Sequence, residues 1–227
     1  MDAMLAMGFG FVEVGSICPR PQTGNPLPRV FRLKKEGAII NRFGFNTQGM
    51  ESAEKRLRAF RARQEDLAAI RPLGEKNFID GILEYLPIYY HRKQTRENAL
   101  RHGIVGVNLG KNKDSIVPMQ VVGEDGKPVL DDYSKVAQCL GSYADYLVLN
   151  VSSPNTPNLR DLQGAKELTA ILTRLNKVRD NMPQHKPPIL IKISPDVSHE
   201  QVIYFRVYIY PTNPSCSHRQ PILRGLR

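Results

Sequence analysis

Polar side chains stand at the ends of four apolar segments of this sequence. Ser16, Asn108, Asn150 and Lys192 each close or follow a short apolar run that is typical of a buried strand. Asparagine amides donate and accept hydrogen bonds, so they suit a planar heterocycle with imide edges. A lone lysine in an apolar strand has to reach an anion or the open end of the strand, because a buried unpaired ammonium is costly. These residues predict a site that holds an anionic cofactor, with ordinary strand-end caps as the alternative reading.

The segments between these residues indicate how they are positioned. Short apolar runs alternate with amphipathic stretches, which predicts a parallel sheet covered by helices. A hairpin is also expected, because two extended segments flank a polar turn at 34–37. The expected strands are 9–14, 30–33, 38–43, 105–110, 146–151 and 188–193, and the expected helices are 1–8, 50–69, 132–140 and 165–179.

Two α/β architectures fit such a pattern, namely a doubly wound open sheet and a (β/α)₈ barrel. A doubly wound nucleotide binder would carry a GxGxxG motif after its first strand, and the sequence has none. Polar residues at the ends of successive strands are what the active site of a barrel requires. The pattern therefore favours the barrel.

Composition excludes several classes of function. The net charge is +10 over 227 residues, but the main basic cluster, 55–63, is interrupted by a single aromatic residue, Phe60, and reads as a solvated helix face. No nucleic-acid partner is therefore expected. The three cysteines show no CxxC spacing, which argues against a zinc site or a disulfide framework, so no metal is expected. No run approaches the roughly 20 apolar residues of a membrane span.

Seven motifs in a fixed order make the pattern specific. Together they resemble the dihydroorotate dehydrogenase family, in its quinone-linked class, over most of residues 1–200. The motifs are Met7-Gly-Phe-Gly-Phe-Val-Glu-Val-Gly-Ser16, Gly24-Asn-Pro-Leu-Pro-Arg-Val-Phe-Arg32, Asn41-Arg-Phe-Gly-Phe-Asn46, Gly106-Val-Asn-Leu-Gly-Lys-Asn112, Asn150-Val-Ser-Ser-Pro-Asn155, Leu159-Arg-Asp-Leu-Gln163 and Lys192-Ile-Ser-Pro-Asp196.

The resemblance implies a (β/α)₈ barrel with FMN at the carboxyl ends of the strands. It implies oxidation of dihydroorotate to orotate in pyrimidine synthesis, with electrons passing through FMN to ubiquinone. A base removes a proton from ring carbon C5, and hydride leaves C6 for the flavin. Ser153 stands at the position of that base, where a serine resembles the quinone-reducing class.

The resemblance also implies further site residues. Arg32 matches an arginine that lines the quinone tunnel. The substrate contacts would be Asn41, Gly44, Phe45, Asn46, Asn150 and Asn155. The flavin contacts would be Gly15, Ser16, Asn41, Asn108, Asn150 and Lys192.

The sequence departs from the family pattern in several places. The membrane-binding helical pair and the first barrel strand, with its substrate-binding lysine, are not found before Met1. We expect residues 1–203 to form a partial FMN-binding barrel, about strands two to five, with insertions near 73–103 and 116–130. Residues 204–227 match nothing in the family and look like an out-of-frame or intron-derived tail.

These departures carry functional expectations. We expect the chain as written not to be a competent enzyme, because the flavin phosphate site of such barrels follows later strands. The resemblance places the protein at the mitochondrial inner membrane, through a segment that this chain lacks. The alternatives are another FMN barrel acting on pyrimidines, which Ser153 in place of a cysteine disfavours, and a catalytically dead basic scaffold.

Overall fold

A computed structural model describes residues 1–70, 103–115, 131–153, 165–183 and 185–194. The chain divides into two compact units, Met1–Ile193 and Ser194–Arg227, and every described helix and strand belongs to the first. Except for residue 103, the insertions near 73–103 and 116–130 lie outside the described residues, as does the tail 204–227, so the expectations for them stay predictions.

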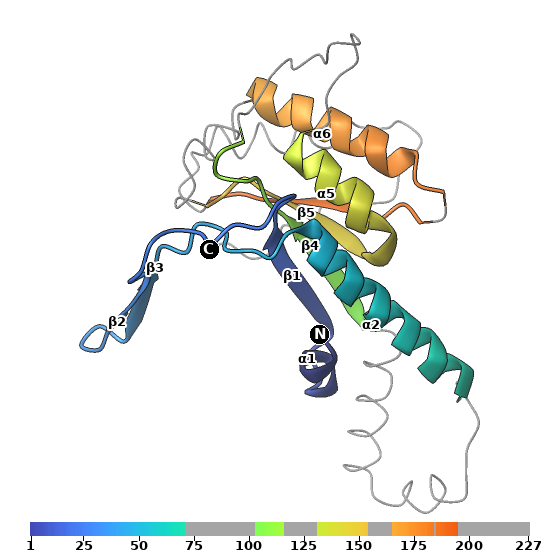
Figure 1. The fold of residues 1–227 in the computed structure, drawn as a ribbon, viewed down its shortest axis with the longest axis horizontal. Helices are drawn as coiled ribbons and strands as arrows, with labels where there is room; N and C mark the ends of the chain where they lie inside the picture. Colours follow the sequence, from blue (N-terminus) through green and yellow to red (C-terminus); the bar gives the residue numbers. More distant parts are fainter. Residues whose placement is uncertain (71–102, 116–130, 154–164, 184, 195–227) are drawn as a thin grey trace, which may run out of the picture. The chain divides into compact units, whose positions relative to one another are not determined.

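A parallel sheet of four strands organises the first unit (Figure 1). The strands are β1 (Phe11–Ile17), β4 (Ile104–Leu109), β5 (Tyr146–Asn150) and β6 (Ile189–Lys192), and they lie in the order β1-β4-β5-β6. Each neighbouring pair is parallel, so all four carboxyl ends lie at one edge of the sheet. Within the described part the sheet is open and does not close into a barrel.

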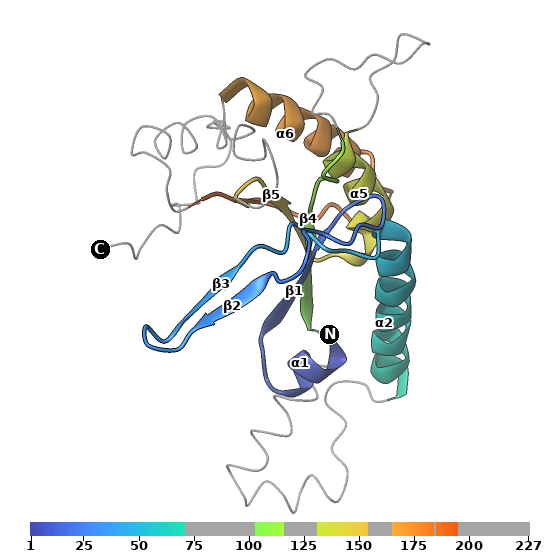
Figure 2. The same ribbon diagram turned by 60° about the vertical axis from the view of Figure 1, so that its left-hand side comes forward.

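Three helices cover the same face of this sheet (Figures 1 and 2). They are α2 (Met50–Ile70), α5 (Asp132–Leu140) and α6 (Ala165–Asp180). The start of α5 is fixed by Asp131, whose carboxylate accepts a hydrogen bond of 2.7 Å from the backbone N–H of Ser134. In the last turn of α6, Lys177 and Arg179 complement the helix dipole.

The core lies between the sheet and these helices. Alternate strand residues such as Val105, Leu147 and Leu149 point into it and are fully buried. The helices contribute further side chains that are at most 2% exposed, namely Leu57, Phe60, Val136, Leu140, Leu168 and Leu175. The opposite side of the sheet, called the inner face below, is far more open: Phe11 is 62% and Leu190 49% exposed.

Smaller elements complete the unit. A short helix, α1 (Asp2–Ala6), precedes β1, and a 3-10 turn, η1 (Gly141–Tyr143), follows α5. Strands β2 (Val30–Leu33) and β3 (Ala38–Asn41) pair antiparallel, with Val30 opposite Asn41, and this hairpin leads away from the sheet (Figure 2). Among the described helices, none is both long and apolar enough to cross a membrane.

Most expected elements are confirmed, and β1 shows the one informative error. The sequence predicts a strand over 9–14 that stops before Gly15, whereas β1 continues to Ile17. The pairing register shifts between Gly15 and Ile17, and Ile17 still pairs with Leu109. Gly15 therefore marks a bulge in a continuing strand rather than its end.

Helix α2 is tied to the sheet by one shared carboxylate. Asp145 Oδ2 accepts hydrogen bonds from Arg61 Nη2 at 2.7 Å and from the backbone N–H of Val105 at 2.6 Å. Arg61 Nε also donates to the carbonyl oxygen of Tyr143 at 3.0 Å. The ion pair of Arg61 and Asp145 thus connects α2, the start of β4 and the turn before β5.

We predict that Asp145→Ala lowers the free energy of unfolding by about 2 kcal/mol, because it leaves the Val105 N–H and the Arg61 guanidinium without their shared acceptor. Urea denaturation measures the loss. The matched control is Asp180→Ala, which removes an exposed pair with Arg179 and should cost within about 0.5 kcal/mol. Equal losses in the two variants would contradict this role of Asp145.

Candidate functional site

The end of β1 is shaped by a glycine that no other residue can replace without strain. Gly15 has φ +123°, and a Cβ there would lie 2.5 Å from the carbonyl oxygen of Asn108. The bulge that follows turns the hydroxyl of Ser16 toward β4, where it donates a hydrogen bond to Asn108 Oδ1. Backbone geometry at Gly15 therefore determines where the hydroxyl of Ser16 lies.

The two strand-end asparagines meet at this hydroxyl. Asn150 Nδ2 donates to Ser16 Oγ at 2.9 Å and to Asn108 Oδ1 at 3.2 Å. Both asparagine side chains are only 5% exposed, so these bonds satisfy polar groups that have little access to water. Three residues from three strands thus form one polar cluster.

Charged side chains extend the cluster on both sides. Asn108 Nδ2 donates to Glu13 Oε1 at 2.7 Å on β1. On the other side, Asn150 Oδ1 accepts from Ser152 Oγ at 2.9 Å and from the Ser152 N–H at 3.1 Å. Lys192 Nζ donates to Ser152 Oγ at 2.7 Å. We call this set the polar row: Glu13, Ser16, Asn108, Asn150, Ser152 and Lys192.

The polar row joins all four strand-end residues that the sequence predicted. Lys192 is exposed at its strand end, as expected of an ammonium that must not be buried alone. Sequence reasoning missed Glu13 and Ser152. Glu13 did carry a signal, because it is a lone charge in an apolar strand, like Lys192. Ser152 carried no signal apart from its place beside Ser153.

A second group of predicted residues lies in the loop after β3. Gly44 is buried with φ +69°, and Phe45 has φ +54°, a left-handed conformation that is uncommon for a bulky residue. Such a conformation persists only where its surroundings enforce it, and it is frequent at binding sites. Asn41 is exposed at the end of β3, and Asn46 is exposed just after Phe45.

Gln22 holds this loop in place. Its Nε2 donates to the carbonyl oxygen of Phe45 at 2.7 Å, and its Oε1 accepts from Asn112 Nδ2 and the Lys113 N–H, each at 3.0 Å. One amide therefore joins the loop after β3 to the loop after β4. Nothing in the sequence marks Gln22 within its loop, which is rich in proline and glycine.

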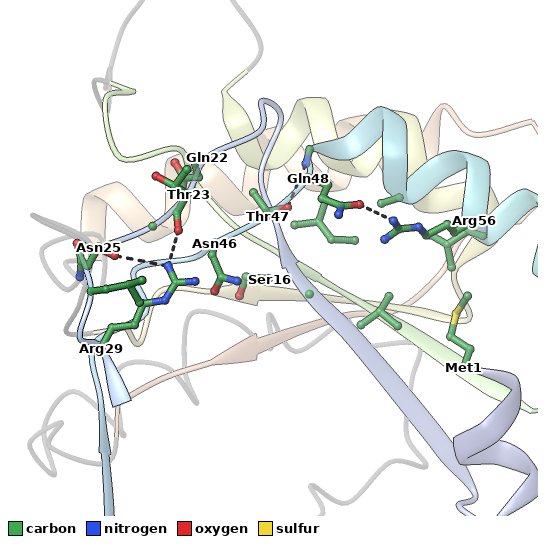
Figure 3. A pocket seen from close by; sticks show the side chains of 18 of the residues that line it. Met1, Ser16, Gln22, Thr23, Asn25, Arg29, Asn46, Thr47, Gln48 and Arg56 are labelled. Atoms are coloured by element: carbon green, nitrogen blue, oxygen red, sulfur yellow. Dashed lines mark hydrogen bonds between the residues drawn. The ribbon is translucent and has the colours of Figure 1, made fainter. Parts of the chain in front are cut away.

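A cavity of about 890 Å³ opens between the end of β1, the loop that follows it and the start of α2 (Figure 3). This volume lies in the range of about 300 to 1,000 Å³ that is usual for small-molecule pockets. Of the predicted residues, Gly15, Ser16 and Asn46 line it, whereas Asn108, Asn150 and Lys192 do not. The cavity and the polar row therefore meet at Ser16.

Two arginines give the cavity wall positive charge. Arg29 donates to the carbonyl oxygens of Thr23 and Asn25, and Arg56 donates to Gln48 Oε1 (Figure 3). These acceptors are neutral, so the hydrogen bonds orient the guanidinium groups without neutralising them. The wall is therefore suited to an anionic ligand.

Three further predicted residues are Ser153, Arg32 and Asn155. Ser153 is half-buried and follows Ser152 at the end of a described range. Arg32 is exposed on β2, in the hairpin that leads away from the sheet. Asn155 lies outside the described residues. In the described ranges, no group of three or more His, Cys, Asp or Glu residues could hold a metal ion.

Two buried ionisable groups, Cys18 and Lys111, lie just after the ends of β1 and β4. Burial, reinforced by Asp132, raises the pKa of the Cys18 thiol to about 12. Burial lowers the pKa of Lys111, and its ammonium donates to the carbonyl oxygens of Asn112 and Ser115. The Cys18 thiol contacts Gln22 and the carbonyl oxygen of Lys111, and neither residue reaches the polar row in the described contacts.

Comparison with known proteins agrees with this geometry. A family model described as dihydroorotate dehydrogenase matches residues 1–210, which extends past residue 203. Dihydroorotate dehydrogenase (quinone), mitochondrial, of Oryza sativa subsp. japonica is 42% identical over 205 residues, covering 89% of this chain and 38% of that protein. The protein of the same name from Mus musculus is 42% identical over 200 residues, covering 87% and 40%.

A solved structure is also similar. The crystal structure of DHODH in complex with ferulenol from Eimeria tenella has a TM-score of 0.61 and 35% sequence identity, and the match covers 86% of this chain and 45% of that one. Such neighbours are (β/α)₈ barrels, which confirms the expected fold class. The chain spans about two fifths of the length of the rice and mouse relatives.

We predict that Gln22→Leu lowers the free energy of unfolding by about 2 kcal/mol, because the Phe45 carbonyl and the Asn112 amide each lose a hydrogen bond. Chemical denaturation measures this free energy. Gln48→Leu serves as the control and should change stability within about 0.5 kcal/mol, since Gln48 is exposed and, among the described residues, is hydrogen-bonded to Ser52 and Arg56. If both variants behave alike, Gln22 does not hold the loops together.

Thiol labelling provides a pH-dependent prediction. With a pKa of about 12, roughly one thousandth of Cys18 is thiolate at pH 9, against about half of an ordinary cysteine. Because folding raises this pKa, its contribution to stability is complete below pH 9 and is lost as the pH rises toward about 12. Cys139, with a pKa of about 11 from burial and Glu54, is the internal control.

Iodoacetamide labelling of the native chain at pH 9, read by peptide mass spectrometry, should modify Cys139 faster than Cys18. In guanidinium chloride the two cysteines should react at similar rates. Faster labelling of native Cys18 would show that its thiol is not enclosed as described.

Proposed function

This chain belongs to the dihydroorotate dehydrogenase family, and we propose that the protein oxidises dihydroorotate to orotate and passes the electrons through FMN to ubiquinone. The observation that carries the proposal is the polar row, which gathers amides, hydroxyls and a cation at the carboxyl edge of a parallel sheet. That edge is where barrels of this kind place their active sites. The reaction would supply orotate to pyrimidine synthesis.

The residues at this edge fit a flavin. Gly15 presents bare backbone, Ser16, Asn108 and Asn150 offer neutral polar groups, and Lys192 offers an exposed cation. In its present position the ammonium of Lys192 is held by Ser152 Oγ, which leaves two of its three protons for a ligand. Bound FMN would supply the two-electron acceptor that these side chains cannot provide.

Substrate recognition would fall to the asparagines and to the loop after β3. Asn41, Asn150 and Asn155 would pair with the amide and imide edges of the substrate ring, and Asn41 would also reach the flavin. Gly44, Phe45 and Asn46 would pack beside the ring, in the loop that Gln22 holds. A loop fixed in this way reduces the ordering cost of substrate binding.

Proton removal would fall to Ser153. A serine hydroxyl is a weak base, so it acts only when the reacting carbon is held in contact and a relay carries the proton away. Ser153 directly follows Ser152, whose two hydrogen bonds to Asn150 Oδ1 fix the chain at that point. The role of the polar row toward Ser153 is therefore to position it.

Other parts of the proposal rest on the family alone. Arg32, on β2, would line a quinone path, and the protein would act at the mitochondrial inner membrane. Residues 1–203 would form the FMN-binding domain, and 204–227 would be a tail with no part in it. Because the chain spans about two fifths of its relatives' length, these assignments concern the whole protein.

We predict three results that test the proposal. The purified 227-residue chain, which we expect to be catalytically incompetent, should retain little FMN through desalting by its absorption spectrum. A chimera that carries residues 1–193 within the mouse relative should retain FMN and oxidise dihydroorotate.

In the chimera, Ser153→Ala should lower kcat at least about 100-fold with little change in KM, because the base is lost while binding contacts stay.

The matched control is Ser142→Ala, an exposed serine in η1, which should leave kcat unchanged. A chimera that folds but neither retains flavin nor turns over dihydroorotate would refute the proposal. Flavin that stays with the isolated chain and bleaches when dihydroorotate is added would refute the expected incompetence.

A further inference from the structure

The hydrogen bonds of the polar row all run in one direction. Lys192 donates to Ser152 Oγ, and Ser152 Oγ donates to Asn150 Oδ1. Asn150 Nδ2 donates to Asn108 Oδ1, and Asn108 Nδ2 donates to Glu13 Oε1. The row therefore leads from an ammonium to a carboxylate through one hydroxyl and two asparagine amides, and Ser16, which accepts from Asn150 and donates to Asn108, follows the same direction.

The charged ends make this direction obligatory. An ammonium can only donate and an ionised carboxylate can only accept. If the amide of Asn108 were turned over, its Oδ1 would face Glu13 Oε1, and its Nδ2 would face Asn150 Nδ2. Two acceptors would then meet on one side and two donors on the other, so the carboxylate selects one of the two amide orientations.

The surroundings of Glu13 suit this role. Glu13 pairs with Gly106 across the strands, and the ring of Tyr146 covers that glycine, because a Cβ there would lie 2.1 Å from Tyr146 Cζ. Burial, and then the charge of Glu13, raises the pKa of Tyr146, which agrees with a carboxylate held close to the ring. The absence of a side chain at Gly106 therefore lets the Tyr146 ring lie beside Glu13.

We propose that Glu13 is a positioning residue that, together with Asn150, fixes the orientation of the Asn108 amide and so keeps Asn108 Oδ1 in place as the acceptor for Asn150 Nδ2. The functional meaning rests on the proposed function, in which these two asparagines face the flavin and the substrate. With the amides oriented as observed, Asn108 and Asn150 each turn a defined edge to a ligand. Without the carboxylate, Asn108 Nδ2 loses its charged acceptor, and the observed orientation rests on the hydrogen bonds that Asn108 Oδ1 accepts from Asn150 Nδ2 and Ser16 Oγ.

Side-chain amide NMR of the isotope-labelled 227-residue chain tests the inference directly. Glu13→Leu should shift the NH₂ signals of both Asn108 and Asn150, although only Asn108 contacts Glu13. Solvent exchange of the Asn108 NH₂ protons should rise roughly tenfold, as expected when a charge-assisted hydrogen bond is lost. Glu13→Gln should restore most of the wild-type spectrum, since its amide oxygen can still accept.

The control is Phe11→Leu, on the same strand and face. Phe11 packs edge-on against Tyr146, with ring centroids 6.4 Å apart, and has no hydrogen bond to the polar row. This variant should leave the asparagine signals in place. Unchanged Asn150 signals in Glu13→Leu, or identical spectra for the Leu and Gln variants, would overturn the inference.

A fluorescence titration with FMN separates this inference from the proposed function. In the chimera that carries residues 1–193 within the mouse relative, Glu13→Leu should raise the Kd for FMN about tenfold, and Glu13→Gln should raise it less. If the unsubstituted chimera folds but does not bind FMN, the proposed function fails, while the amide signals of the 227-residue chain still decide the role of Glu13. Equal Kd values in the unsubstituted chimera and Glu13→Leu would count against an orienting effect on the ligand.

Discussion

Parallel pairing of four strands is the constraint on which the rest of this structure depends. It places the ends of β1, β4, β5 and β6 at one edge, so polar side chains separated by up to 134 positions in the sequence become hydrogen-bonded neighbours. Asn108 and Asn150 are buried there, and their polar atoms have to be satisfied by one another and by the residues beside them. The polar row is the result: a network in which each member satisfies the next.

Local backbone geometry at two places completes the arrangement. The bulge at Gly15 turns Ser16 toward the asparagines without ending β1, because Ile17 still pairs with Leu109. The left-handed conformation of Phe45 is held by Gln22, whose other bonds reach the loop after β4. In both places a strained or irregular backbone lies next to the cavity and is supported by contacts distant in sequence, as expected where geometry serves binding.

Much of the fold could be predicted from sequence, and the reasons for success and failure are physical. Helix α5 was predicted at its observed bounds, because Asp131 caps its start and its apolar spacing is regular. The predicted end of β1 was wrong because a glycine in sequence usually indicates the end of a strand, whereas Gly15 forms a bulge within it. Lys192 was recognised as a lone charge in an apolar strand, and the same reasoning applies to Glu13. Gln22 left no signal, because its partners lie in two loops that only the fold brings together.

The one-way order of the polar row has a consequence for any molecule that lies along it. Its positive end is Lys192 on β6 and its negative end is Glu13 on β1, so the two ends of the row carry opposite charges. A flat ligand with unequal ends can be laid on the sheet edge in two head-to-tail arrangements, and these now differ in energy. The charges at the two ends of the polar row therefore favour one orientation of such a ligand, independently of its contacts with the surrounding loops.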